Sequence, residues 1–422
     1  MPDLLLPPGV RYACIRCGAC CRSLEVTLTD AEHERLAGHD WSGELADYAP
    51  ERYFARRRGV RGRQTWRLRS QPSGACRFLT DDGLCRVHSV LGYKAKPFAG
   101  RLFPFTFTVT PIGVFVGVRF SCPAVVRGKG PELEKQRHDI QRLYREYAKA
   151  YAPPKAPERV RFHRGFELSW HDAVRLEDQL LAFLLSQDLP IARRLLACRR
   201  LVHRFLKEAS GSADGERVGV EPDEILAEAA AAQPEGNGLS RIEGALLRLL
   251  TAAFVGVAPP SFRELSMGGR LRVRLGNVGR RLRMALGRGR VVLPELPEAV
   301  PVADATAADG GELDMPTEAM LERYYVAKVA SQGFFGQSFF GRSFLEGIDF
   351  LASSYGAILW LARAHAVAAG RRRVAADDVA YAIRQVDHGL GYSPAFAGGL
   401  DRARAFFFRA WATQDRILMR NA

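Results

Sequence analysis

Cys14-Ile15-Arg16-Cys17-Gly18-Ala19-Cys20-Cys21 places four thiols within eight residues, and we expect the first third of the chain to fold around it. Thiolates are soft, charged ligands, and one metal ion binds about four of them. Two residues between successive cysteines allow a short loop to turn both sulfur atoms toward one point. Glycine adopts positive φ at no steric cost, so Gly18 can supply the kink that such a loop needs. This stretch therefore predicts a metal or iron–sulfur site.

The other cysteines extend the set of candidate ligands. Cys76, Cys85 and Cys122 follow in the next hundred residues, whereas Cys198 lies alone in a helical pattern and is interpreted as a buried small hydrophobe. Asp82-Gly83 predicts a tight hairpin turn that brings Cys76 and Cys85 side by side. Another stretch of alternating apolar residues predicts a second hairpin, whose return strand ends at Cys122. The predicted metal ligands are Cys14, Cys17, Cys20, Cys21, Cys76, Cys85 and Cys122.

The ligand set leaves the identity of the metal open. Neighbouring side chains diverge, so Cys20 and Cys21 fit different metals, or different irons of one cluster, more easily than one tetrahedral zinc. Seven thiols also exceed the four that a closed zinc site needs. The first three spacings match the start of a bacterial ferredoxin-type run, but the fourth does not. The cofactor is therefore an iron–sulfur cluster or zinc. His88 is a candidate auxiliary ligand, although a surface histidine is the simpler interpretation.

The composition predicts a folded cytoplasmic protein of several domains. The chain has 422 residues, of which 47% are hydrophobic, and this is enough for substantial cores. In a reducing compartment, clustered cysteines are more often metal ligands than disulfides. The N-terminus has no signal-peptide pattern. The longest apolar stretch, around Phe350–Ala362, falls short of the roughly 20 residues that span a bilayer, so we expect no membrane span.

The expected strands and helices predict an α+β chain. A small cysteine-rich metal-binding domain with short strands and hairpins precedes a mostly α-helical region. A Pro-rich stretch at 152–158 marks the first boundary. The expected parts are a cysteine-cluster metal-binding domain at 1–151, a helical domain at 159–256, a basic segment and linker at 257–315, and a C-terminal helical domain at 316–422.

Positive charge is the other marked feature of the chain. The net charge of +15 favours acidic partners, and an arginine-rich composition bias is an equal alternative. Met267–Arg290 contains eight arginines and no acidic residue, and its apolar residues repeat at helical spacing. These apolar residues are Leu271, Leu275, Val278, Leu282 and Leu286. An amphipathic helix packed on its own domain is favoured over one that lies on an acidic partner or a lipid surface. Nucleic-acid binding rests on charge alone and ranks last.

The cysteine pattern resembles the YkgJ-like cysteine-cluster family, whose members are described as zinc- or iron-chelating domains. The resemblance covers residues 10–125 and begins with Cys14-x2-Cys17-Gly-x-Cys20-Cys21. It continues through Cys76-Arg-Phe-Leu-x4-Leu-Cys85, Lys96-Pro97, Arg101-Leu-Phe-Pro-Phe105 and Cys122-Pro123. The family usually has a cysteine where this chain has Gly100, so one ligand of the family set is missing here. His88 or a water molecule is a candidate replacement.

The wider layout is similar to that of the flagellin lysine-N-methylase relatives, which pair a cysteine-rich N-terminal part with a helical C-terminal region. The Tyr324-Tyr325 helix and the long helix after it carry this likeness. It implies methyl transfer from S-adenosylmethionine to a protein substrate such as flagellin. The sequence contains neither a Gly-rich methyl-donor motif nor the Cys-x3-Cys-x2-Cys spacing of radical enzymes, so no catalytic residues are predicted. The alternative is a non-catalytic zinc- or iron-binding module that binds an acidic partner through its basic helices.

Overall fold

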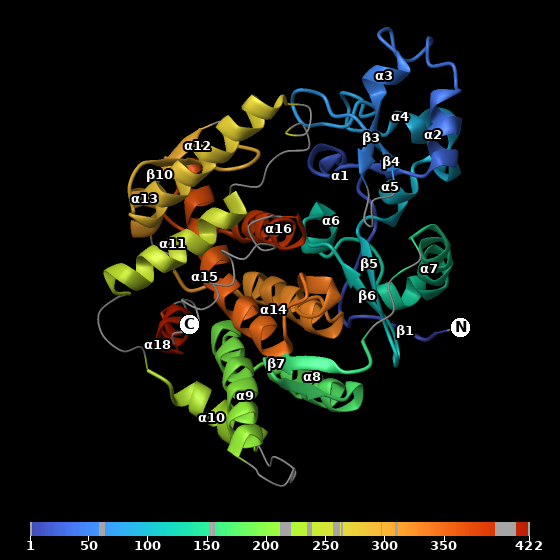
Figure 1. Ribbon diagram of the computed structural model, residues 1–422. Helices are drawn as coiled ribbons and strands as arrows, with labels where there is room; N and C mark the ends of the chain where they lie inside the picture. Colours follow the sequence, from blue (N-terminus) through green and yellow to red (C-terminus); the bar gives the residue numbers. More distant parts are fainter. Residues whose placement is uncertain are drawn as a thin grey trace.

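The structure is a computed structural model of the chain, and it combines small sheets with many helices (Figure 1). Two three-stranded sheets lie in the N-terminal third, and helices dominate the remainder, which confirms the predicted α+β class. The expected junctions at 152–158 and 256–257 fall largely outside the described residues, and the division into four parts stays a prediction. The described residues are 2–58, 64–151, 153, 157–211, 221–233, 239–255, 262, 265–296, 298–308, 311–392 and 411–420.

The two N-terminal sheets are built from short antiparallel pairs with one parallel edge. The first sheet has the order β1-β6-β5, with β1 (Leu4–Leu5) parallel to β6 (Gly113–Val118) and β5 (Phe105–Thr110) antiparallel to it. The second has the order β2-β4-β3, formed by β2 (Thr27–Leu28), β4 (Gln64–Leu68) and β3 (Phe54–Arg58). The hairpin of β5 and β6 confirms the second hairpin that the alternating apolar residues predict.

Short helices lie between these strands, and α6 (Pro123–Val126) and the longer α7 (Arg137–Tyr151) follow the last of them. The helices between the strands are α1 (Ala19–Ser23), α2 (Asp30–Ala37), α3 (Pro50–Tyr53), α4 (Arg86–Leu91) and α5 (Phe98–Leu102). A capping box begins α2, in which Glu32 accepts a hydrogen bond from Thr29 N at 2.9 Å. The other carboxylate oxygen of Glu32 accepts from Phe98 N at 2.6 Å. One acidic side chain therefore holds the start of α2 against the start of α5.

The described residues of the remainder are mostly helical, with two short hairpins, β7 (Val160–His163) with β8 (Phe166–Leu168) and β9 (Arg290–Val292) with β10 (Ala299–Pro301). Its helices are α8 (Trp170–Leu185), α9 (Ile191–Gly211), α10 (Pro222–Ala231), α11 (Arg241–Val255), α12 (Met267–Ala285), α13 (Val302–Ala307), α14 (Met315–Ala330), α15 (Phe344–Ala368), α16 (Ala376–Tyr392) and α18 (Trp411–Met419).

The long helix α15 is the centre of this helical region. By length and composition it is the one described helix that could cross a membrane, but 89% of its most apolar window is buried inside the structure. The helices α9, α11, α13, α16 and α18 pack against it. Its apolar composition is therefore explained by its place in the core.

Among the described residues, buried apolar side chains form two clusters, and cysteines contribute to both. The smaller cluster lies within residues 28–87 and includes Trp41 and Phe78. The larger one joins the β5–β6 hairpin to the C-terminal helices. Cys21, Cys76 and Cys85 belong to or pack against the smaller cluster, whereas Cys122 belongs to the larger one. These four cysteines are thus divided between two hydrophobic cores, whereas Cys14 and Cys17 are exposed.

A buried ion pair fixes the end of the β5–β6 hairpin to the helices. Lys328 on α14 pairs with Asp387 on α16, and both side chains are buried. Asp387 also accepts a hydrogen bond from Ser121 N, next to Cys122, at 2.9 Å. Burial lowers the pKa of Lys328, and the carboxylate of Asp387 opposes this shift. The position of Cys122 therefore depends on packing against the helical region.

Candidate metal centre

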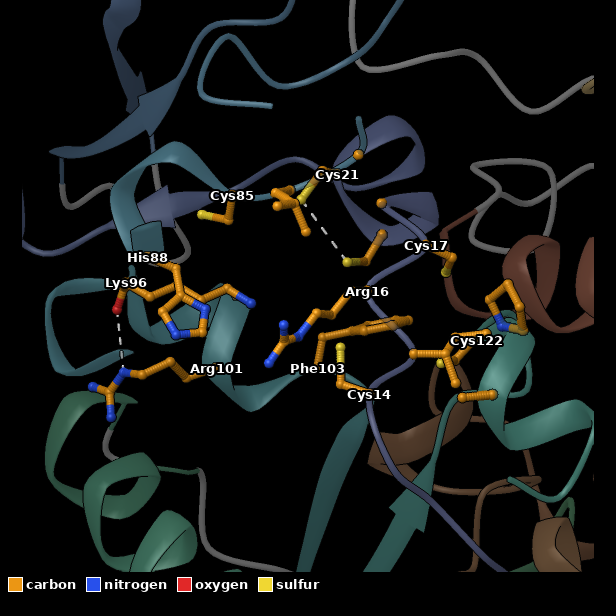
Figure 2. A pocket seen from close by; sticks show the side chains of 18 of the residues that line it. Cys14, Arg16, Cys17, Cys21, Cys85, His88, Lys96, Arg101, Phe103 and Cys122 are labelled. Atoms are coloured by element: carbon orange, nitrogen blue, oxygen red, sulfur yellow. Dashed lines mark hydrogen bonds between the residues drawn. The ribbon is translucent and has the colours of Figure 1, made fainter. Parts of the chain in front are cut away.

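A cavity of about 500 Å³ collects most of the cysteines (Figure 2). The cysteines that line it are Cys14, Cys17, Cys20, Cys21, Cys85 and Cys122. Cys76 is buried in the smaller core instead, and its backbone N–H donates to the carbonyl of Cys21 at 2.7 Å. Cys198 lies on α9, where its thiol faces the carbonyl of Leu180 at 3.6 Å. Three separate segments of the N-terminal region thus supply the six thiols around one cavity.

The first segment is the loop that enters α1. Gly18 caps this helix with a φ of +67°, which confirms the kink that the sequence predicts. Arg22 closes the loop, because its guanidinium donates to the carbonyl of Cys17 at 3.1 Å. A Cβ atom on residue 18 would lie 3.0 Å from the carbonyl oxygen of Gly83. The loop therefore packs directly on the turn that precedes Cys85.

Gly18→Ala should destabilise the protein because it strains the backbone and pushes the two cysteine segments apart. Gly9→Ala is a matched control, since Gly9 has a φ of +68° but no atom lies within 4 Å of the position that an added methyl group would take. We expect about 1 kcal/mol of destabilisation for Gly9→Ala from backbone strain alone, and more for Gly18→Ala. Urea unfolding of the two variants measures the difference. Equal losses would show that the close approaches to Gly83 and to the guanidinium of Arg22 contribute nothing.

The second segment contains the predicted turn at Asp82-Gly83, but its register differs from the expectation. Thr80 N donates to the carbonyl of Leu84 at 2.9 Å, which confirms the turn. Leu79, rather than Cys76, is the bridge partner of Cys85. The hairpin is consequently too short to place the two cysteines directly opposite each other. Cys85 reaches the cavity, whereas Cys76 lies behind it.

The third segment brings Cys122 to the cavity from the β5–β6 hairpin. Cys122 caps the N-terminus of α6, and its carbonyl accepts from Val126 N at 3.1 Å. The helix α6 packs on α16. Burial raises the pKa of the Cys122 thiol to about 11. This cysteine is thus held by the larger core, across the cavity from those of the smaller core.

The contact between the neighbouring thiols of Cys20 and Cys21 favours the thiolate form of one of them. The Sγ atoms of Cys20 and Cys21 lie 3.9 Å apart. A hydrogen bond from the Cys21 thiol lowers the pKa of Cys20 to about 6, whereas the same bond and burial raise the pKa of Cys21. Burial raises the pKa of Cys76 to about 12. Because metals bind the thiolate, Cys21, Cys76 and Cys122 would each have to lose a proton to become ligands.

Cationic side chains surround the same cavity. Arg16, Lys96 and Arg101 line it, and the exposed His88 lies at its edge. Arg101 is fixed by an ion pair with Glu146 at 2.7 Å and donates to the carbonyl of Lys96 at 3.1 Å. Sequence reasoning included Lys96 and Arg101 in the family resemblance but gave them no role. The charge of Lys96 favours the thiolate forms of Cys20 and Cys76, because it lowers the pKa of both.

Gly100, where the family usually has a cysteine, also lines the cavity. A Cβ atom there would lie 3.1 Å from Cε of Lys96. A lysine side chain therefore occupies the space beside the missing ligand.

The donor set has the chemistry of a thiolate metal site, but its side chains are not in a coordinating arrangement. Among the described residues, no three Cys, His, Asp or Glu side chains are placed to hold one metal ion. Figure 2 shows Cys21 and Cys85 on one side of the cavity, and Cys14, Cys17 and Cys122 on the other. Soft ligands are present in sufficient number for zinc or an iron–sulfur cluster, so the residues fit such a group chemically.

A second cavity, of about 880 Å³, adjoins the first and shares Ile15, Cys17 and Pro123 with it. We call it the arginine cleft. Its arginines are Arg22, Arg127, Arg280, Arg281, Arg290 and Arg384. Of the described residues that line it, Glu295 alone is acidic, and this carboxylate pairs with Arg384 at 2.7 Å. The sequence draws attention to the arginines of 267–290, but it gives no sign that arginines from three other segments join them.

The fold and the cavity define a cysteine-cluster domain followed by a helical region. Residues 13–123 match the family model CxxCxxCC, described as "Putative zinc- or iron-chelating domain", and this confirms the resemblance over the cysteine-rich region. An uncharacterized protein of Methanocaldococcus jannaschii is 24% identical over 127 residues, which cover 29% of this chain and 39% of that relative. No solved structure matches the chain. The layout of the flagellin lysine-N-methylase relatives is not confirmed by these comparisons.

Proposed function

We propose that the thiolates of the cysteine cavity bind either zinc or an iron–sulfur cluster. The observation that supports this most is that three separate segments bring six thiols to one cavity. Zinc would supply a redox-inert cross-link, and an iron–sulfur cluster would supply one-electron chemistry. The proposed ligands are Cys14, Cys17, Cys20, Cys21, Cys85 and Cys122, with Cys76 behind them as a further thiol.

The position of the cavity gives the metal a structural role as well. Cys21 and Cys85 are anchored in the smaller hydrophobic core, and Cys122 in the larger one. Ligands from both sides would tie the two cores together. A structural zinc contributes on the order of 10 kcal/mol to a small domain. Arg16, Lys96 and Arg101 would offset the negative charge that several thiolates bring to the site.

Anaerobic purification followed by elemental analysis tests this proposal and identifies the metal. We expect either stoichiometric zinc in a colourless protein, or iron and sulfide in a brown protein with visible absorption. Purification of the same chain with cavity cysteines replaced by serine provides the control for adventitious metal. A protein that contains neither metal after anaerobic purification, and takes up neither on reconstitution, would contradict the proposal.

The arginine cleft favours a second function, the binding of an acidic partner next to Cys17. Six arginines line the cleft, where Glu295 pairs with Arg384 and Asp377 pairs with Arg127, so the cleft keeps a net positive charge that would attract an acidic peptide. We expect a labelled polyglutamate peptide to bind, with an affinity that falls as salt rises. Arg280→Gln with Arg290→Gln should weaken binding, whereas Arg145→Gln, on the exposed surface of α7, should not. Equal effects of these substitutions would indicate non-specific attraction to the net charge.

Methyl transfer to a protein lysine stays a prediction based on the layout resemblance. Incubation of the metal-loaded protein with labelled S-adenosylmethionine and flagellin tests it directly. Absence of transfer would remove this activity but would leave metal binding as proposed. The cytoplasmic location likewise stays a prediction.

A further inference from the structure

The helix α12 presents a continuous apolar stripe to solvent. The stripe consists of Leu271, Leu275, Val278, Leu282 and Leu286, all of which are exposed. The sequence pattern favours packing of these residues on their own domain, and that prediction is wrong for this face. Their exposed fractions, with that of Met267, run from 53% to 82%. The helix is nevertheless unbroken from Met267 to Ala285 despite Gly276 and Gly279.

The stripe and the face that packs on the protein lie on opposite sides of α12. At about 100° per residue, the exposed positions fall within an arc of roughly 100°. Val273 and Met284 project on the other side, where they line the arginine cleft and Met284 is buried. The helix packs on α11 and β9. Two apolar residues are thus enough for the inner contact, and the larger apolar face has no partner among the described residues.

Arginines flank the stripe on both sides. By the same helical geometry, Arg272 and Arg283 lie along one edge, and Arg270 and Arg274 lie along the other. The whole helix contains no acidic residue. Long arginine stems can place their charge above an apolar surface while their methylene groups lie along it. A basic helix with an exposed apolar face is the pattern of segments that lie in a membrane interface.

We propose that α12 binds the surface of an anionic membrane, with its apolar stripe in the acyl boundary and its arginines on the phosphate groups. The helix is about 28 Å long from its 19 residues and lies at the edge of the molecule (Figure 1). A flat lipid surface can cover the exposed face of a helix without a matching groove. This proposal is independent of the metal centre, because the stripe faces away from the arginine cleft.

Two other occupants fit the stripe less well. A second copy of the chain, paired stripe to stripe, would set arginines against arginines with no carboxylate on α12 to offset them. A folded acidic protein would need an apolar groove bordered by carboxylates on both sides. Anionic lipid supplies apolar depth and negative charge along the whole length of the helix. Membrane binding is therefore the interaction that the surface favours.

Sedimentation of the full-length protein with lipid vesicles tests the proposal. We expect binding to vesicles of phosphatidylcholine with added phosphatidylglycerol, weaker binding as salt rises, and little binding to pure phosphatidylcholine. Leu275→Ser with Leu282→Ser should reduce the affinity about tenfold or more. Ile242→Ser with Leu185→Ser is the matched control, since both side chains are exposed elsewhere, and it should leave binding unchanged.

The charges are tested separately from the apolar stripe. Arg272→Gln with Arg283→Gln should reduce the affinity about fivefold for each charge and flatten the salt dependence. Circular dichroism should show unchanged folding for every variant, because the replaced side chains are exposed. No binding of the wild-type protein to anionic vesicles would overturn the proposal, as would equal losses in the stripe variant and its control. A dimer that forms without vesicles and is lost in the stripe variant would assign the stripe to a second copy instead.

Discussion

Replacing Cys20 by serine should remove most of the bound metal from the purified protein. Cys20 lies at the centre of the set, because its Sγ contacts that of Cys21 at 3.9 Å and its charge acts on both Cys76 and Cys122. Serine has nearly the same shape but offers a hard oxygen in place of a soft thiolate. We expect the metal content to fall several-fold, and the thermal unfolding temperature to approach that of the metal-free protein.

Cys198→Ala provides the control for this experiment. Cys198 is buried on α9 in the larger core and does not line the cysteine cavity. Its loss should cost a little stability through a small void but leave the metal content unchanged. Unfolding after chelation supplies a second check, since Cys20→Ser and the wild-type protein should then be equally stable. Retention of the full metal content by Cys20→Ser would remove this residue from the ligand set.

The local parts of the site were predictable because short-range rules determine them. Cysteine spacing identifies the loop at Cys14–Cys21, the positive φ follows from Gly18, and Asp82-Gly83 identifies the turn. The pairing beyond that turn was not predictable, and it differs by three residues from the expected one. Leu79 therefore takes the place opposite Cys85 that was expected for Cys76. A shift of this size decides which thiol faces the cavity and which faces the core.

The features that depend on packing between distant segments could not be read from the sequence. Helical spacing shows that Leu271, Leu275 and Leu282 share a face, but it does not show which side of α12 the protein covers. The arginine cleft likewise needs Arg22, from the N-terminal region, beside α12. The sequence predicts one small domain for the clustered cysteines, whereas the structure packs Cys76 and Cys85 with the smaller hydrophobic core and Cys122 in the larger one. Tertiary contacts alone determine these arrangements.

Lys328→Met should lower the free energy of unfolding more than most single substitutions in the helical region. It leaves the carboxylate of Asp387 buried without its cation, and breaking a buried ion pair in this way costs about 3–5 kcal/mol. Adding Asp387→Asn should recover much of the loss, because the neutral amide can still accept from Ser121 N. The pair is therefore expected to couple strongly in a double-mutant cycle. Urea unfolding of the metal-free proteins measures the free energy of unfolding of the wild type, of the two single variants and of the double variant.

An exposed ion pair provides the control that separates burial from charge. Arg142 and Asp139 on α7 lie 2.6 Å apart, but their side chains are 63% and 71% exposed. Solvent screens such a pair, so Arg142→Met should change the free energy of unfolding by less than about 1 kcal/mol. Similar losses for Lys328→Met and Arg142→Met would show that Lys328 and Asp387 are solvated. In that case Asp387 could not fix Ser121, and the position of Cys122 would have to depend on the packing of α6 against α16 alone.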